Sequence, residues 1–435
     1  MVASTDIKFY VHTNNNAPQL QNAYGSMINV IDACLVNGIN IGAISSLTVS
    51  GKTVTALFST SHNLIQYQVI KITGVDQSEF NGEHRILTVP NAQSVMFELA
   101  AVPSVSTATG TITASLPPLG WEKPFSSVNV NGGGKAAYRS LNLLLPSRPF
   151  LRVVDELDPV WTSTYAKYAK VGIVEDMLDI DRMLGGQAPF DAALPDKNWV
   201  GTGSGTSAIN GWAKWYYART QYEYELNYGV SDNSSTPNGN RSYLLIGTAD
   251  VFYILPSVVA SYQDSVSCYG FGAFKSYLQD DSGANFLNAS FSYGAAGSLT
   301  NRICMYGTIA NYENNASNSA VLQRNIGGAS ASWAEGRSES FLTRSYSNYY
   351  ISGYGNISGS PGSLGQVFLL PIKIHGQSIL RGEFPLVKFI PHSKPYNNLQ
   401  TISIANRKII SKNIMGLASG ASTFLYGSLV FDLGE

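Results

Sequence analysis

A stretch with strand-like alternation, from Ala43 to Thr113, constrains the fold more than any other part of the chain. Apolar and polar residues alternate there with the period of two that is typical of half-buried strands. The first two runs, Leu47–Ser50 and Thr53–Leu57, are separated by Gly51 and Lys52, which suit a two-residue turn with positive φ. The sequence therefore predicts a β-hairpin at this point.

Further short runs in this stretch also have strand character. A strand buries its apolar face by stacking on another sheet, so several short strands in close succession favour an immunoglobulin-type β-sandwich or a small barrel. The expected strands are Gln68–Thr73, which ends at Gly74, and then His84–Val89, Val95–Leu99 and Gly110–Thr113.

Short motifs of the same stretch carry a resemblance to a known family. They are Val49–Thr55, Ser61–Leu64, Val69–Val75, Phe80–His84, Leu87–Ala92, Pro103 and Thr107–Thr111. Together they resemble an immunoglobulin-like module that recurs in virion structural proteins of tailed bacteriophages. Asn63, Gln66 and Tyr67 depart from the pattern His-Gly-hydrophobic-small-x-Gly that is frequent in such modules. The module is an architectural part and specifies no chemistry.

The residues before this module cannot form a domain of their own. Ile7–Val11 predicts a strand, and the apolar spacing within Tyr24–Leu35 predicts a helix that ends at Gly38. One strand and one short helix do not bury a core. Residues 1–40 are therefore expected to pack with the main domain, residues 41–117 to form the inserted module, and residues 118–435 to form a main β-sandwich domain.

The main domain is expected to be β throughout. The resemblance to phage structural proteins continues there more weakly, in Lys135–Ser140, Phe150–Asp155, Met177–Asp181, Tyr269–Ser276 and Ile379–Pro385. Expected strands are Trp215–Arg219, Tyr222–Tyr228, Ser242–Ile246, Val251–Leu255, Arg302–Tyr306, Val367–Ile374, Val387–Ile390, Thr401–Ile404 and Phe424–Phe431. Residues 282–365 are rich in Ser, Gly, Asn and Ala, and predict long surface loops that become ordered against a neighbouring subunit.

The charge composition argues against nucleic acid as a partner. Charged residues are 13% of the chain, and 28 basic against 29 acidic side chains leave a net charge of −1 without a basic cluster. The 25 tyrosines leave two alternatives open. Aromatic side chains can fill cores and subunit interfaces, or they can stack on sugars from exposed loops.

The cysteines and the N-terminus bear on the cellular compartment. Cys34, Cys268 and Cys304 form no pair at disulfide or metal spacing, which predicts buried reduced thiols. Residues 1–6 lack the charged and apolar parts of a secretion signal, and no apolar run is long enough to span a membrane. We therefore expect a protein that folds in the host cytoplasm and does not insert into a membrane.

Paired carboxylates are the strongest candidates for chemistry. Asp155 with Asp158, and Asp179 with Asp181, could suggest glycoside hydrolysis. The alternative is that Asp179 and Asp181 share a strand face or cap a turn beside Arg182. Asp280 and Asp281, before Ser282-Gly283, are typical of a turn.

Other motifs for chemistry are incomplete. The Gly-rich segment Asn131–Lys135 lacks the first glycine and the final Ser or Thr of a phosphate-binding loop, and Gly201–Gly205 lacks the spacing of a nucleophile elbow. The histidines are too far apart in sequence to suggest a metal site. They are His12, His62, His84, His375 and His392. The sequence thus predicts no catalytic, cofactor or metal site and no enzyme.

The resemblance implies a structural component of a tailed-phage virion, located in the tail. The expected form is a non-contractile tail sheath or collar, a homo-oligomeric ring of six copies around the tail tube that contacts other tail, tube or portal proteins. The alternative is a tail appendage or fibre protein that binds a carbohydrate or receptor on the host surface. Fibres commonly carry internal repeats, and the sequence has none.

Overall fold

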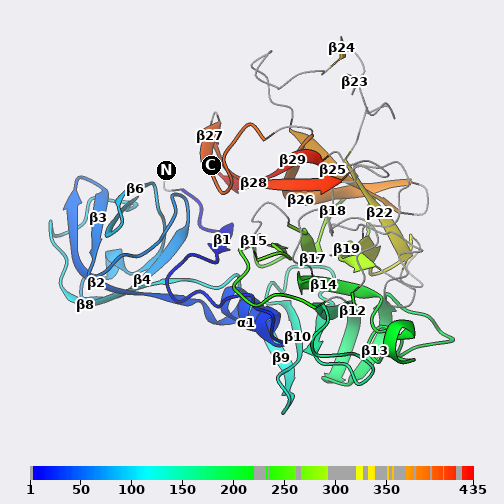
Figure 1. The fold of residues 1–435 in the computed structure, drawn as a ribbon. Coiled ribbons are helices and arrows are strands. Elements are labelled where there is room, and N and C mark those ends of the chain that lie inside the picture. The colour runs from blue at the N-terminus through cyan, green and yellow to red at the C-terminus, as the bar shows by residue number, and fades with distance from the viewer. Residues whose placement is uncertain are drawn as a thin grey trace.

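A computed structural model describes most of the chain. The described residues are 3–219, 232–233, 235–260, 266–291, 320–326, 332–338, 350–351, 355–356, 369–376, 379–391, 394–404, 406–417 and 424–435. They form antiparallel sheets and one short α-helix near the N-terminus, so the expectation of a mainly β fold with one such helix is confirmed (Figure 1). No helix in this part of the chain is long and apolar enough to cross a membrane.

The helix α1 (Ser26–Asp32) continues into a π-helical turn, Ala33–Asn37. It ends where expected, because Gly38 adopts a φ of 79° that side chains with a Cβ rarely tolerate. Its apolar face, including Met27 and Ile31, is buried in the largest hydrophobic core. The helix packs on the strands β10 (Gly133–Ser140) and β11 (Phe150–Glu156).

The first seven-stranded sheet is formed by residues 39–116 alone and has the order β5-β4-β8-β2-β3-β7-β6. Its strands are β2 (Ile39–Ser50), β3 (Thr53–Phe58), β4 (Val69–Val75), β5 (Gly82–Arg85), β6 (Thr88–Asn91), β7 (Ser94–Glu98) and β8 (Gly110–Leu116), with a 3-10 turn at Ser78–Phe80. Ser50 pairs with Thr53 across the predicted turn, where Gly51 has a φ of 63°. The first predicted hairpin is therefore confirmed.

Two strand expectations in this sheet are corrected. The third run does not end at Gly74 but continues to Val75 through an irregularity of the pairing with β8. The run His84–Val89 is divided between β5, which pairs with β4, and β6, which pairs with β7. The linking residues bridge both neighbours, since the Ile86 amide donates to Gln68 O and the Leu87 amide to Met96 O. The two ends of the sheet are thus consecutive in sequence, as in a small barrel.

The positions that depart from the phage-module pattern have an unusual backbone. Asn63 and Tyr67 adopt φ values of 51° and 69°. This left-handed conformation is the one that glycine adopts most easily, and the pattern has glycine at these two positions. The turn before β4 therefore holds two residues other than glycine in the left-handed conformation.

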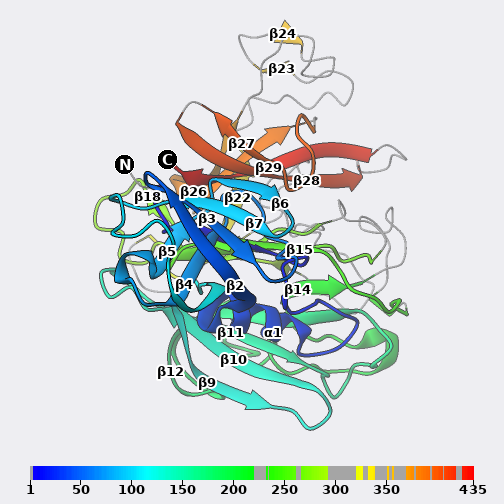
Figure 2. The same ribbon diagram turned by 90° about the vertical axis from the view of Figure 1, so that its left-hand side faces the viewer.

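The N-terminal segment joins this sheet to the main domain. β1 (Lys8–Val11) pairs with β15 (Tyr243–Gly247). Arg85 donates from Nε to Ser4 O at 2.6 Å and from Nη2 to Ile7 O at 2.9 Å. Figure 2, turned by 90°, shows β2 to β7 in front of the other sheets. Whether residues 41–117 fold independently stays a prediction.

The second seven-stranded sheet has the order β20-β14-β12-β11-β10-β9, with β13 paired to β12. Its strands are β9 (Trp121–Val128), β10 (Gly133–Ser140), β11 (Phe150–Glu156), β12 (Lys167–Asp179), β13 (Arg182–Ala188), β14 (Ala213–Ala218) and β20 (Ser290–Phe291), with a 3-10 turn at Gly205–Ser207. β9 is an edge strand of this sheet.

The largest sheet has the order β1-β15-β16-β17-β19-β21-β22-β25-β26-β29-β28-β27. Its further strands are β16 (Val251–Pro256), β17 (Tyr269–Ala273), β18 (Lys275–Ser276, paired to β26), β19 (Asn285–Asn288), β21 (Ala320–Leu322), β22 (Ser332–Ser338), β25 (Leu370–Gly376), β26 (Ile379–Pro391), β27 (Thr401–Ile404), β28 (Arg407–Leu417) and β29 (Phe424–Gly434). β23 (Tyr350–Ile351) and β24 (Gly355–Asn356) form a separate pair.

The strands β15 to β19 lie between two other layers of strands. One face of the strands β15 to β19 packs on the second seven-stranded sheet, where Trp215 lies edge-on to Phe252 at 6.1 Å between ring centroids. The other face packs on the far half of the same large sheet, where Phe286 lies edge-on to Phe384 at 4.7 Å. The middle strands are therefore buried on both faces (Figure 1).

The expectation of surface loops at residues 282–365 is wrong for the described strands β19, β20 and β21 of that stretch. Leu287 and Val321 are fully buried in the core. Their apolar runs are short, but they suffice because other layers cover both faces of the sheet. The expected strands Tyr222–Tyr228 and Arg302–Tyr306 lie outside the described residues.

Candidate functional site

The turn between β12 and β13 holds Asp179 and Asp181, one of the two candidate carboxylate pairs. Asp179 Oδ1 accepts the backbone amides of Asp181 and Arg182, each at 2.9 Å. The Asp179 carboxylate also pairs with the Arg182 guanidinium. This arrangement is the turn cap that the sequence offered as the alternative to a catalytic role.

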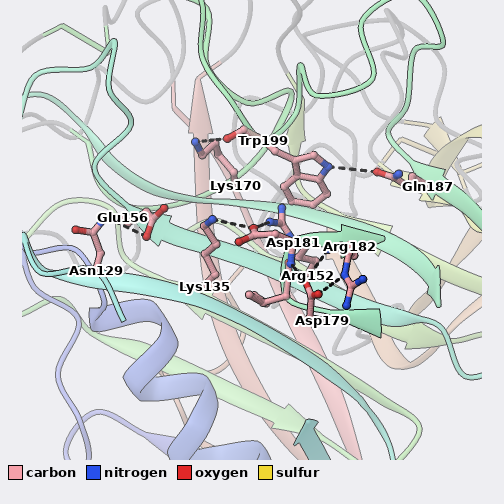
Figure 3. Close-up of polar contacts among 11 residues, drawn as sticks. Asn129, Lys135, Arg152, Glu156, Lys170, Asp179, Asp181, Arg182, Gln187 and Trp199 are labelled. Carbon is pink, nitrogen blue, oxygen red and sulfur yellow. Dashed lines mark hydrogen bonds and ion pairs between the residues drawn. The ribbon is translucent and has the colours of Figure 1, made fainter. Parts of the chain in front are cut away.

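Asp181 lies between two cations that come from other strands (Figure 3). Its Oδ1 accepts Lys135 Nζ of β10 and Arg152 Nη2 of β11, each at 2.8 Å. Arg152 Nε also donates to the carbonyl of Ile180 at 2.8 Å. The cluster therefore fastens the β12–β13 turn to the neighbouring strands.

The buried guanidinium of Arg152 also contacts an aromatic ring. It lies 4.5 Å from the centroid of the Trp199 ring, within the range of a cation–π interaction. Trp199 Nε1 donates to Gln187 Oε1 at 3.3 Å. The ring also needs the glycine at position 172, because a Cβ there would lie 2.6 Å from the Trp199 ring. The loop that carries Trp199 is thus fixed on β11 and β12.

Asp155 and Asp158, the other candidate pair, lie in two different environments. Asp158 forms a buried ion pair with Lys170 at 2.6 Å and accepts the amide of Gly201 at 2.9 Å. Lys170 Nζ also donates to Trp199 O at 2.6 Å. Burial lowers the pKa of Lys170, although Asp158 acts in the opposite direction. This pair holds the loop at residues 199–201 against β12.

Asp155 points instead at the start of helix α1. Its Oδ2 accepts the backbone amides of Met27 at 3.1 Å and Ile28 at 3.3 Å, and its Oδ1 accepts Tyr217 OH at 2.6 Å. Burial raises the pKa of Asp155 to about 6, while these hydrogen bonds act in the opposite direction. The carboxylate satisfies helix amides that have no partner within the helix.

The two carboxylates of the β12–β13 turn both have lowered pKa values. The hydrogen bond from Arg182 lowers the pKa of Asp179. Burial raises the pKa of Asp181, but the hydrogen bonds and charges of Lys135 and Arg152 outweigh it and the pKa is lowered. Both groups are therefore ionised at neutral pH, whereas a glycosidase general acid needs a raised pKa.

The two incomplete glycine-rich motifs and the Asp280-Asp281 pair also lie in the described part of the chain. Residues 131–135 lie in the β9–β10 hairpin, and residues 201–205 lie in the loop after Trp199. Asp280 adopts the left-handed conformation of a turn, with a φ of 57°. Asp281 forms a buried ion pair with Arg381 at 2.7 Å.

The remaining candidate ligands and aromatics are mostly buried. The described part of the chain holds no group of three or more His, Cys, Asp or Glu that could bind a metal ion. Cys34 and Cys268 are buried, and Cys304 lies outside the described residues. Among the described aromatic side chains, Phe190 and Tyr277 are the exposed ones. The described tyrosines therefore mainly fill the core.

The sequence did not single out Arg152 or Trp199 as parts of a site. Arg152 interrupts an apolar run within β11, and such an interruption signals a buried charge that needs a partner. The partner itself was not predictable, because Asp181 lies 29 residues away in sequence.

The comparisons with known proteins do not identify a family for this chain. No known protein family matches the sequence, and comparison with curated proteins gives no match either. Among solved structures, the phage phi92 endosialidase aligns with 91% of this chain at 10% identity and a TM-score of 0.16. The alignment spans 52% of that protein's chain, so this chain spans about half its length. Similarity at this level supports no conclusion about fold or function.

Proposed function

We propose that this chain is a structural component of a tailed-phage virion. The observation that carries the proposal is the resemblance of residues 49–111 to the phage immunoglobulin-like module, together with where those residues lie. Val49–Thr55 spans the β2–β3 hairpin, and Val69–Val75 is the strand β4. The motifs thus lie on strands and a turn of one small sheet, and this position supports an architectural role.

The role that we propose is mechanical. Layers of strands with hydrophobic cores between them resist deformation, and the ion pairs of Asp158 and Asp181 fasten loops to those strands. The low content of charged residues, 13%, suits surfaces that pack against other subunits. We propose no catalysis. A saccharide-cleaving activity of the protein that the double substitution Asp179→Asn, Asp181→Asn abolishes would contradict this part.

The specific form that we propose is a non-contractile tail sheath or collar. Six copies form a ring around the tail tube and contact other tail, tube or portal proteins. The protein is made in the host cytoplasm and becomes part of the virion tail. A closed ring follows from a head-to-tail contact between identical subunits, provided that the rotation between neighbours closes.

Mass spectrometry of purified particles tests this proposal. Isotope-labelled peptides of this chain, added in known amounts, give its copy number per particle relative to the portal protein. We expect the chain in the particle at six copies, or at a multiple of six if rings stack. Absence from purified particles would overturn the proposal.

A further inference from the structure

The most exposed apolar side chains of the described residues fall in two segments on either side of the strand β10. Val128 and Val130, at the tip of the β9–β10 hairpin, have 90% and 98% of their surface exposed. Leu143 and Leu144, in the loop after β10, are 76% and 91% exposed. Large apolar residues exposed together commonly mark an interaction site.

The hairpin tip, residues 128–132, projects from the sheet (Figure 1). The amide of Asn129 donates to Gly133 O at 2.9 Å, and the amide of Gly132 donates to Asn129 O at 3.0 Å. The side chain of Asn129 reaches Glu156 of β11 at 3.2 Å. These bonds hold the tip in shape while its two valines point away from the core.

The leucine loop, residues 141–146, is also held in place. Asn142 accepts the amide of Leu144 at 3.0 Å and donates to Asp250 at 2.8 Å. Just beyond the loop, Ser147 donates to Gln323 at 2.9 Å and Arg148 to Ser140 O at 2.7 Å. Both leucines are therefore presented to solvent by a loop that is hydrogen-bonded on each side.

The two surfaces cannot meet within one molecule. They lie at opposite ends of β10, a strand of eight residues, which at about 3.3 Å per residue separates them by roughly 25 Å. Neither segment contains a charged residue, so their contact removes no charge from water. A second copy of the chain offers an apolar surface of the matching kind at the required end.

We propose that the hairpin tip of one copy packs on the leucine loop of the next copy in a head-to-tail contact. The contact rests on the proposed ring and names the surfaces that build it. It is heterologous, because the two partners use different surfaces, and contacts of this type close into rings or extend into filaments. With a net charge of −1 per chain, identical copies repel each other little.

Sedimentation velocity of the full chain at increasing concentration tests the contact. The tip variant carries Val128→Thr and Val130→Thr, and the loop variant carries Leu143→Gln and Leu144→Gln. We expect the wild type to self-associate and each variant to associate at least about tenfold more weakly. The control is Val102→Thr, which changes an exposed valine outside both surfaces and is expected to leave association unchanged.

Mixing the two variants distinguishes a head-to-tail contact from a symmetric one. The tip variant keeps its leucine loop and the loop variant keeps its tip, so an equimolar mixture should form one-to-one dimers that do not grow. A monomeric wild type, variants that associate like the wild type, or a mixture without heterodimers would each overturn the contact. These outcomes are independent of mass spectrometry on particles, which tests the proposed function.

Discussion

Asp155 is the residue whose surroundings give the clearest pH-dependent effect. It is fully buried, and it joins β11 to the first amides of α1 and to Tyr217 of β14. Its pKa of about 6 in the folded chain lies above the usual value of 3.8. The folded state therefore binds this proton more tightly than the unfolded state, and the contribution to stability is greatest at low pH.

We predict that Asp155→Asn removes this pH dependence. As pH rises from 4 to 6, the wild type should lose about 2 kcal/mol of unfolding free energy relative to the variant. The amide can keep the bonds to α1, and Tyr217 OH can donate to Ala23 O, which lies 3.4 Å away. Chemical denaturation of both proteins at a series of pH values measures the difference. A difference that is constant or that grows in favour of the wild type would contradict the assignment.

How far single residues could be predicted depended on the range of their contacts. The turn role of Asp179 follows from residues two and three positions away, and the sequence offered it. The partner of Asp155 lies 128 residues away at Met27, and no local pattern contains that contact. Long-range contacts of this kind are decided by the packing of the helix and the sheets and not by spacing in the sequence.

Among the elements, the strands β4 and β8 leave no room for a side chain at two glycines. Gly74 has a φ of 82°, and a Cβ on it would lie 2.0 Å from Thr111 O. Gly110, on the facing strand, has the same restriction, because a Cβ there would lie 2.2 Å from Gly74 O. The pairing is irregular at this point, so the two strands depend on the absence of side chains.

We predict that Gly74→Ala destabilises the protein by at least about 3 kcal/mol, because it adds a backbone clash to an unfavourable φ. The matched control is Gly51→Ala at the hairpin turn, where φ is also positive but no atom lies within 4 Å of the added Cβ. The control should cost about 1–2 kcal/mol, the strain of the left-handed conformation alone. Thermal and denaturant unfolding measure both values, and equal costs would show that the close approach is not rigid.

Local signals predicted most of the elements around the first sheet. Gly51-Lys52 fixed the first hairpin, and the apolar spacing with Gly38 fixed the helix. The division of His84–Val89 was not predictable, because it follows from the closure of the sheet between β4 and β7. The strand β28 was missed as well, although it pairs along its whole length with β29.

For the whole molecule, the two ends of the segment 43–113 lie next to each other, which is the geometry that an inserted domain needs. Gly42 and Ala114 are Cα partners on the adjacent strands β2 and β8. The chain therefore enters and leaves the segment 43–113 at neighbouring positions. A short linker between these two residues makes a hairpin without displacing what lies on either side.

We predict that replacing residues 43–113 with a short flexible linker leaves a soluble β-rich protein with cooperative thermal unfolding. Its melting temperature should fall, because the contacts of Arg85 and Gln68 with the N-terminal segment are lost. The control carries the same linker inserted between Gly51 and Lys52 of the full chain. If the shortened protein unfolds without cooperativity while residues 1–116 fold alone, the proposed boundary is wrong.

We propose that this chain builds a ring around the tail of a phage particle. The position of the chain in an electron-microscopy map of the intact particle tests it most directly. We expect six copies in a closed ring around the tail axis, with the β9–β10 hairpin of each copy against residues 141–146 of its neighbour. Copies located instead at the end of a fibre or appendage that reaches the host surface would contradict it.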